Sequence, residues 1–214
     1  SEMGVKFDGF FDGDFLNEGE IVGGDSHGVF FDQTLMGNFT NAAGARIWGQ
    51  ENGVQFDANQ WYNPESEEDE AVDSLAGNFN NHGEIFSGNS HGVVFRSTVM
   101  GNFWNSSTGT IVALNRNGVL QDYNGTGWHG DFTNEGLIEG SQFMTEDGED
   151  YPSIGFGVKL RNHFAGDFTN DGTIRGKQAV FIGGDFTGDY VNRGMFTGAH
   201  EGGACLGYDE DEDE

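Results

Sequence analysis

The segment GDFTNEGLIEG at Gly130–Gly140 returns as GDFTNDGTIRG at Gly166–Gly176. Each copy starts with Gly, then Asp or Asn, then Phe, and the same opening recurs at Gly13, Gly37, Gly77, Gly101 and Gly184. A polar residue and usually Asn follow the Phe, and an aliphatic residue lies two positions after the next Gly. Self-similarity of this kind is typical of repeat architectures, so we expect one repetitive domain.

Alignment of the copies gives three apolar columns. The Phe column contains Phe15, Phe39, Phe79, Phe103, Phe132, Phe168 and Phe186. The Ile column contains Ile21, Ile47, Ile85, Ile111, Ile138 and Ile174 and ends at Phe196. A third column runs through GVFF, GVQF, GVVF, GVL, GFGVKL and AVFI at Gly28–Phe31, Gly53–Phe56, Gly92–Phe95, Gly118–Leu120, Gly155–Leu160 and Ala179–Ile182.

These apolar stretches are too short for helices, and Gly or Asn turns separate them. Three short strands in each turn of roughly 18–24 residues are typical of a parallel β-helix. We therefore predict an all-β, single-stranded parallel β-helix, a right-handed solenoid of about seven or eight coils. It would occupy residues 1–208, and residues 209–214 would form an acidic tail. Stacking of identical side chains at about 4.8 Å explains the columns.

Three repeats are longer than the others, which predicts loop insertions at residues 57–76, 121–129 and 145–153. We expect two of the loops to be partly ordered by their aromatic residues, which are Trp61, Tyr62, Trp128 and Tyr151. The segment Gly13–Asn41 also matches Gly77–Asn105 without a gap. This match indicates duplication of a two-coil unit. Duplication of this kind is expected for a structural repeat and seldom for a catalytic site.

The charge of the chain restricts its partners. It has 36 acidic and 9 basic residues and a net charge of -27. Such a chain repels nucleic acid and anionic membrane surfaces, and it favours divalent cations as partners. No apolar run is long enough for membrane insertion of this segment. The single cysteine, Cys205, excludes an internal disulfide.

The second residue of the repeat forms a column of carboxylates and amides. Its members are Asp14, Asn38, Asn78, Asn102, Asp131, Asp167 and Asp185. Stacked carboxylates could bind Ca²⁺, and the pair Asp167 and Asp185 would be the best place for a cation. The exchange between Asp and Asn favours a turn role instead. Other Ca²⁺ candidates are Asp12 in FDGFFDGD and Asp147 and Asp150 in EDGED, although neither segment matches an EF-hand. No cofactor is required.

Two further polar patterns are interpreted as structural. A second Asn column contains Asn17, Asn41, Asn81, Asn105, Asn134 and Asn170, and stacked amides hydrogen-bond along such a column. The two SHG segments place His27 and His91 in equivalent coils, about two coils apart. That separation is too large for the two histidines to share one metal ion.

A cluster of basic residues late in the chain leaves an enzymatic alternative open. Lys159, Arg161, Arg175 and Lys177 could share one face of a β-helix. A polysaccharide lyase or glycoside hydrolase would use such a face, with a Lys or Arg base in the lyase case. The acidic charge of the chain opposes acidic sugars as substrates, and a surface ion-pair network is the favoured interpretation of the cluster.

The repeats of GDFTNEGLIEG resemble those of autotransporter passengers and haemagglutinin-type adhesins of Gram-negative bacteria, over Gly13 to about Gly198. The resemblance implies a secreted β-helix displayed at the bacterial outer membrane. Its expected function is that of a non-enzymatic stalk or adhesin segment, whose partner is a protein or carbohydrate on a host or neighbouring cell. An ice-binding face would need a regular Thr column, but Leu16, Asn80 and Trp104 interrupt Thr40, Thr133 and Thr169.

Overall fold

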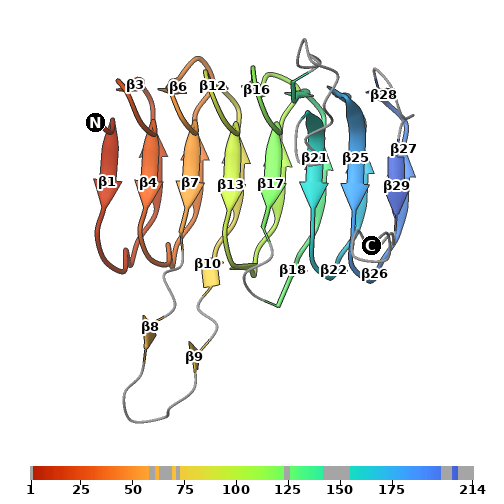
Figure 1. Cartoon of the computed structure of the whole chain (residues 1–214), viewed down its shortest axis with the longest axis horizontal. Helices are drawn as coiled ribbons and strands as arrows, with labels where there is room; N and C mark the ends of the chain where they lie inside the picture. The colour runs from red at the N-terminus through yellow and green to blue at the C-terminus, as the bar shows by residue number, and fades with distance from the viewer. Residues whose placement is uncertain are drawn as a thin grey trace, which may run out of the picture.

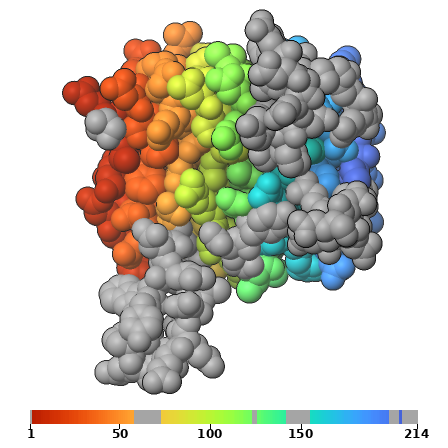
Figure 2. All heavy atoms as spheres, in the orientation of Figure 1, coloured from red at the N-terminus to blue at the C-terminus, as the bar shows by residue number. Residues whose placement is uncertain are grey.

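The chain folds into a solenoid whose coils follow one another along its long axis (Figure 1). The computed structural model describes residues 2–57, 61–62, 69–70, 73–122, 126–141, 155–198 and 204–206. This part of the chain contains strands and turns and no helix, so it has no helix that could cross a membrane. In the space-filling view the coils form successive bands in sequence order (Figure 2). The predicted parallel β-helix is therefore confirmed.

Four parallel sheets make up the described part of the solenoid, and each is named here for its place in the repeat. The Phe sheet contains β2 (Phe15–Asn17), β5 (Phe39–Asn41), β11 (Phe79–Asn81), β15 (Phe103–Asn105), β19 (Phe132–Asn134), β23 (Phe168–Asn170) and β27 (Tyr190–Asn192). The Ile sheet contains β3 (Glu20–Gly23), β6 (Arg46–Gly49), β12 (Glu84–Ser87), β16 (Thr110–Ala113), β20 (Leu137–Glu139), β24 (Thr173–Gly176) and β28 (Met195–Gly198).

The third sheet follows the Ile sheet in each coil and is called the Val sheet. It contains β1 (Val5–Phe7), β4 (Val29–Phe31), β7 (Val54–Phe56), β13 (Val93–Phe95), β17 (Val119–Gln121), β21 (Phe156–Leu160), β25 (Gln178–Ile182) and β29 (Ala204–Leu206). The short sheet closes each coil and contains β10 (Asp73–Leu75), β14 (Thr98–Val99), β18 (Trp128–His129), β22 (Phe164–Ala165) and β26 (Phe186–Thr187).

Strand register places identical residues above one another in successive coils. Phe79 pairs with Phe39 on one side and with Phe103 on the other. The rings of Phe79 and Phe103 stack in parallel, with centroids 4.9 Å apart. Ile85 pairs in the same way with Ile47 and Ile111. The stacked rings and aliphatic side chains are buried and form one continuous core along the axis.

The short sheet is a fourth apolar column that the sequence alignment missed. Its buried residues lie two positions before the Gly that opens each repeat, and they include Leu75, Val99, Trp128 and Phe164. Trp128 lies in this sheet and not in a loop, and it is fully buried with its ring edge-on against Phe103 and Phe132. The predicted loop 121–129 is therefore too long, because Gln121 and Trp128–His129 belong to strands.

The other two predicted insertions differ in how far the structure describes them. The predicted insertion at residues 57–76 ends too late in the sequence, because β10 at Asp73–Leu75 already belongs to the solenoid. Within this insertion β8 (Trp61–Tyr62) and β9 (Asp69–Glu70) pair in antiparallel fashion, and they project from the side of the solenoid (Figure 1). The predicted loop 145–153, with Tyr151, lies outside the described residues.

The last repeat is shifted by four residues from its predicted position. Phe168 pairs with Tyr190, whereas Phe186 pairs with Phe164 in the short sheet. The segment Gly188–Gly194 is thus the true last copy of the motif, and Gly184–Phe186 only imitates its opening. Asp189, and not Asp185, continues the column of Asp167, because its backbone N–H donates to Asp167 Oδ1 at 2.9 Å.

The predicted Asn column is a ladder of side-chain amides inside the turn. Asn41 Nδ2 donates to Asn81 Oδ1 at 2.9 Å, and Asn81 Nδ2 donates to Asn105 Oδ1 at 2.8 Å. The ladder begins at Asn17 and continues past Asn170 to Asn192, which the alignment did not include. Asn81 is fully buried, and the amides of the ladder bond to neighbouring coils and, as at Asn105, also to the backbone of their own turn.

Close approach of successive coils explains why so many turns contain glycine. Gly92 precedes β13, and a Cβ atom at this position would lie 2.6 Å from Gly118 O and 2.6 Å from Ile111 Cγ2. Those distances are far below van der Waals contact, and the same Gly recurs at the equivalent position of neighbouring coils. The glycines therefore serve packing, and their abundance does not indicate disorder.

Replacement of Asn81 by Ala is expected to destabilise the solenoid strongly. It removes one acceptor of the Asn41 amide, which keeps its bond to Glu84 O, and it removes the donor to Asn105 Oδ1. A buried group that loses its partner costs about 1–3 kcal/mol. Asn80→Ala, on the outer face of the same strand, is the control and should change the free energy of unfolding by less than ~0.5 kcal/mol. Chemical denaturation measures both, and equal losses would contradict a stabilising ladder.

Candidate functional site

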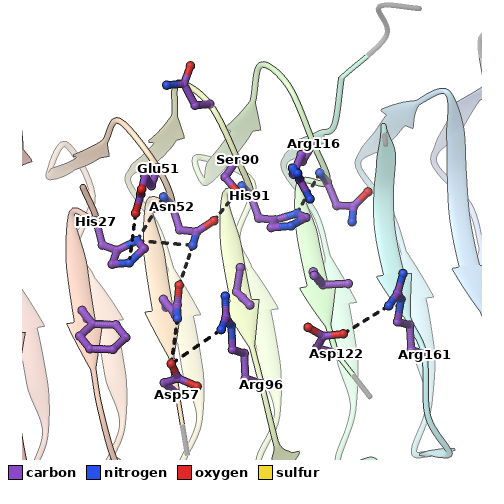
Figure 3. Close-up of a pocket in the computed structure, with 16 residues that line it drawn as sticks. His27, Glu51, Asn52, Asp57, Ser90, His91, Arg96, Arg116, Asp122 and Arg161 are labelled. Carbon is purple, nitrogen blue, oxygen red and sulfur yellow. Dashed lines mark hydrogen bonds and ion pairs between the residues drawn. The ribbon is translucent and has the colours of Figure 1, made fainter. Parts of the chain in front are cut away.

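A groove of about 710 Å³ crosses the outer face of the Val sheet. Its residues come from β4, β7, β13 and β17 and from the turns beside these strands, and the fifth coil contributes Arg161, which follows β21 (Figure 3). These strands are consecutive neighbours in the sheet, so the groove runs along the solenoid axis and not around one coil. At about 4.8 Å between strands, the first and fifth strands lie about 19 Å apart.

The groove floor consists of the middle residues of the Val-sheet strands. Because side chains alternate along a strand, the inward positions of Val93 and Phe95 leave Val94 on the outer face. Phe30, Gln55 and Leu120 occupy the same position in their coils. The floor is therefore mainly apolar and includes one amide.

One wall of the groove is a second ladder, built from alternating His and Asn residues. The backbone N–H of Asn52 donates to His27 Nδ1 at 3.3 Å, and that of His91 donates to Asn52 Oδ1 at 2.9 Å. Asn117 then donates to His91 Nδ1 at 3.1 Å, and Phe156 donates to Asn117 Oδ1 at 3.0 Å. The SHG segments thus have the structural role expected of them.

These hydrogen bonds also fix the protonation of His91. Its Nδ1 accepts a hydrogen bond, so the proton of the neutral ring lies on Nε2. Burial lowers the pKa of His91 to about 3, and the charges of Arg116, Arg96, Arg161 and Lys159 contribute to this shift. Burial likewise lowers the pKa of His27, against the opposite effect of Glu51. His91 is therefore an uncharged N–H donor on the groove wall at neutral pH.

The opposite wall carries charges that alternate from coil to coil. Asp57, Arg96, Asp122 and Arg161 each follow the last residue of a Val-sheet strand. Arg96 Nη1 lies 3.9 Å from Asp57 Oδ2, and Arg161 Nη1 lies 3.4 Å from Asp122 Oδ1 (Figure 3). The wall therefore presents two acid–base pairs side by side, with acceptors and donors in alternation.

A polar relay connects the two walls in one coil but not in the coil of Asn117. Asn52 Nδ2 donates to Gln55 Oε1 at 2.6 Å, and Gln55 Nε2 donates to Asp57 Oδ2 at 3.1 Å. In the coil of Asn117 the floor residue is Leu120, which offers no side-chain acceptor. Among the described atoms, Asn117 Nδ2 is buried and has no hydrogen-bond partner. Asn117 Nδ2 is thus a buried donor of the groove that the described atoms leave unsatisfied.

The basic residues proposed for a lyase do not share one site. Arg161 lines the groove, and Lys159 is buried with its Nζ 4.6 Å from the ring centre of Phe156. Arg175 lies on the outer face of the Ile sheet, where its Nη2 contacts Glu139 Oε2 at 2.6 Å. Lys177 follows the same Ile-sheet strand, between β24 and β25. Only Arg161 of the four lines the groove.

The carboxylate column has a role in the turns, which was the alternative to Ca²⁺ binding. Asp14 Oδ1 accepts the backbone N–H of Asn38 at 2.7 Å, and Asp131 Oδ1 accepts that of Asp167 at 2.9 Å. Asp185 lies outside this column, as shown above, and Asp12 adjoins the first coil. Asp147 and Asp150 lie outside the described residues. The described part of the chain contains no cluster of three or more His, Cys, Asp or Glu side chains that could bind a metal ion.

Sequence reasoning missed most of the groove residues. A usable signal was present, because the residue after each third-column stretch is charged in the relevant coils. These residues are Asp32, Asp57, Arg96, Asp122 and Arg161. Recurrence of one residue type does not reveal this position, because it is acidic at Asp32, Asp57 and Asp122 and basic at Arg96 and Arg161.

Comparisons with known proteins identify no relatives. No protein-family model matches the chain, and no curated protein or solved structure matches it. The site is therefore interpreted from its own geometry.

Replacement of His91 by Asn is expected to make stability less sensitive to acid. The unfolded chain binds a proton at His91 below its ordinary pKa of 6.5, whereas the folded chain does so only near pH 3. The neutral ring therefore costs stability as pH falls below 6.5, by up to about 1.4 kcal/mol per pH unit. Asn can accept the same backbone hydrogen bond, as Asn52 does.

Denaturation curves at pH 7 and pH 5 measure this effect. The His91→Asn substitution should reduce the loss of unfolding free energy between these two pH values by up to about 2 kcal/mol. An equally steep loss in the variant and the parent chain would show that His91 is not held neutral by the fold.

Proposed function

We propose that this chain is a non-enzymatic recognition segment, in which a rigid β-helix presents the groove of the Val sheet to a partner. The observation that carries the proposal is that the groove wall is itself a hydrogen-bonded ladder from His27 to Phe156. Its polar groups are therefore held at fixed spacing before any partner binds, which reduces the entropic cost of binding.

The location and partner in this proposal come from the resemblance of the repeats to autotransporter passengers and haemagglutinin-type adhesins. We place the segment outside the cell, displayed at a bacterial surface. Its partner would be a protein or carbohydrate on a host or neighbouring cell. The stacked core supports this assignment, because a solenoid joined coil by coil is suited to act as a stalk.

One observation favours the enzymatic alternative. Asp57 and Asp122 lie on the same wall two coils apart, which corresponds to about 9.6 Å at the usual strand spacing. Inverting glycoside hydrolases place their two carboxyl groups about 6.5–9.5 Å apart, so this separation lies at the upper limit of their range. However, each carboxylate faces an arginine, whereas a general acid needs surroundings that retain its proton. Reducing-end release from a polysaccharide panel that disappears in Asp122→Asn would establish the enzyme and refute the proposal.

Adhesion measurements test the recognition role directly. Beads coated with the chain should bind target cells, and Arg96→Ala should weaken this binding because it removes one charged pair of the groove wall. Arg46→Ala is a matched control, since Arg46 makes an equivalent pair with Glu84 at 3.0 Å on the outer face of the Ile sheet. Equal effects of the two variants, or no adhesion by the parent chain, would contradict the proposal.

Divalent cations enter this proposal as counter-ions of stacked carboxylates. Asp131, Asp167 and Asp189 lie in successive coils on the solvent-exposed side of the turn. Like charges at this spacing destabilise a sheet by about 0.2–1 kcal/mol, and Ca²⁺ would reduce that repulsion.

Asp167→Asn should therefore raise the unfolding free energy in EDTA at low salt by about 0.5 kcal/mol. The amide keeps the Oδ1 acceptor, and Asn already occupies this column at Asn38, Asn78 and Asn102. Asn102→Asp adds a fourth stacked charge and should have the opposite effect. Added Ca²⁺ should reduce the difference in unfolding free energy between each variant and the parent chain. If Ca²⁺ leaves the thermal midpoint of the parent and of both variants unchanged, the counter-ion role is contradicted.

A further inference from the structure

We propose that the groove binds an uncharged oligosaccharide whose chain lies along the solenoid axis. The inference rests on the proposed recognition role of the groove and specifies the chemical class of its ligand. Four features of the groove support it: its charge balance, its paired donors and acceptors, its apolar floor and the unsatisfied amide of Asn117.

The groove is electrically balanced in a chain that is otherwise strongly acidic. Arg96, Arg116 and Arg161 line it together with three carboxylates, which are Glu51, Asp57 and Asp122. Both histidines of the wall are neutral near pH 7, since their pKa values are lowered. An anionic ligand meets the repulsion of the whole chain, whose net charge is -27, and the balanced lining offers a cationic ligand no local excess of carboxylates. A ligand without charge needs no such excess and avoids the repulsion.

The charged wall matches the chemistry of neighbouring hydroxyl groups. Each Asp–Arg pair presents a carboxylate acceptor and a guanidinium donor within 3.4–3.9 Å of one another. One hydroxyl of a sugar ring can donate to the carboxylate while the adjacent hydroxyl accepts from the guanidinium, because each hydroxyl is both donor and acceptor. The pairs recur every second coil, so they suit a ligand that repeats along the groove.

The floor and the opposite wall supply the remaining contacts. Phe30 and Leu120, which are 8% and 6% exposed, are the accessible apolar parts of the floor, with Gln55 and the buried Val94 between them. The C–H face of a pyranose ring can pack on either. Asn117 Nδ2 is a buried donor without a partner among the described atoms, and His91 offers Nε2–H beside it. A ligand hydroxyl or ring oxygen would satisfy the Asn117 donor, which the apolar Leu120 does not.

Binding of neutral hexasaccharides of glucose, mannose and galactose to the full chain tests this inference. Calorimetric titration at physiological salt should detect at least one of them, with affinity rising from disaccharide to tetrasaccharide, since the groove spans about 19 Å. A hexauronate at the same concentration should bind more weakly than its neutral counterpart.

Asn117→Asp is the informative variant, because it keeps the Oδ1 acceptor for Phe156 but replaces the unsatisfied donor with an acceptor. It should weaken oligosaccharide binding about tenfold or more. Asn78→Asp makes the same exchange in the exposed column, where Asp occurs naturally at equivalent positions, and should leave binding unchanged. Thermal unfolding of both variants checks that they remain folded.

The outcomes separate the ligand class from the recognition role. Tighter binding of the hexauronate, affinity independent of length, or equal binding by Asn117→Asp and Asn78→Asp would overturn the inference. If no neutral hexasaccharide binds while cell adhesion persists and falls in Arg96→Ala, the inference fails and the proposed function stands. If the parent chain shows no adhesion, the proposed function fails as well.

Discussion

The separation of about 4.8 Å between successive coils is the constraint on which this molecule depends. It equals the distance at which aromatic rings stack and at which one side-chain amide reaches the next. Phe rings, Ile side chains and Asn amides therefore each pack against their own kind. A residue that breaks the match, such as a side chain at the position of Gly92, forces two coils apart and disturbs every column at once.

Most of the fold could be predicted from the sequence because residues that stack in successive coils are of the same type and therefore recur along the sequence. The Phe, Ile and Asn columns are visible since each repeats one residue type in register. The short sheet was missed because its core position accepts Leu75, Val99, Trp128 or Phe164, and its strands are only two or three residues long. The last coil was misplaced because Tyr190 replaces Phe, while Gly184–Phe186 imitates the opening of the motif.

The groove was harder to predict for a different reason. Its walls need complementary residues in neighbouring coils, so Asp57 is followed in space by Arg96 and then by Asp122. Such a position varies from coil to coil, and alignment by identity discards it. Only His27 and His91 recur among these residues, and their role is structural. Their alternation with Asn52 and Asn117 is seen only in the order of the coils in the structure.

The Asn ladder runs in one direction along the axis, whereas the hydrogen bonds of the groove wall and of the outer Asp/Asn column are donated toward the N-terminal side. Each amide of the Asn column donates toward the C-terminal side and accepts from the N-terminal side, from Asn17 through Asn192. Aligned dipoles of this kind reinforce one another, as they do in a hydrogen-bonded chain. The Asn ladder is consequently polar along the solenoid axis, and two such solenoids can extend one another's Asn ladders only when they meet head to tail.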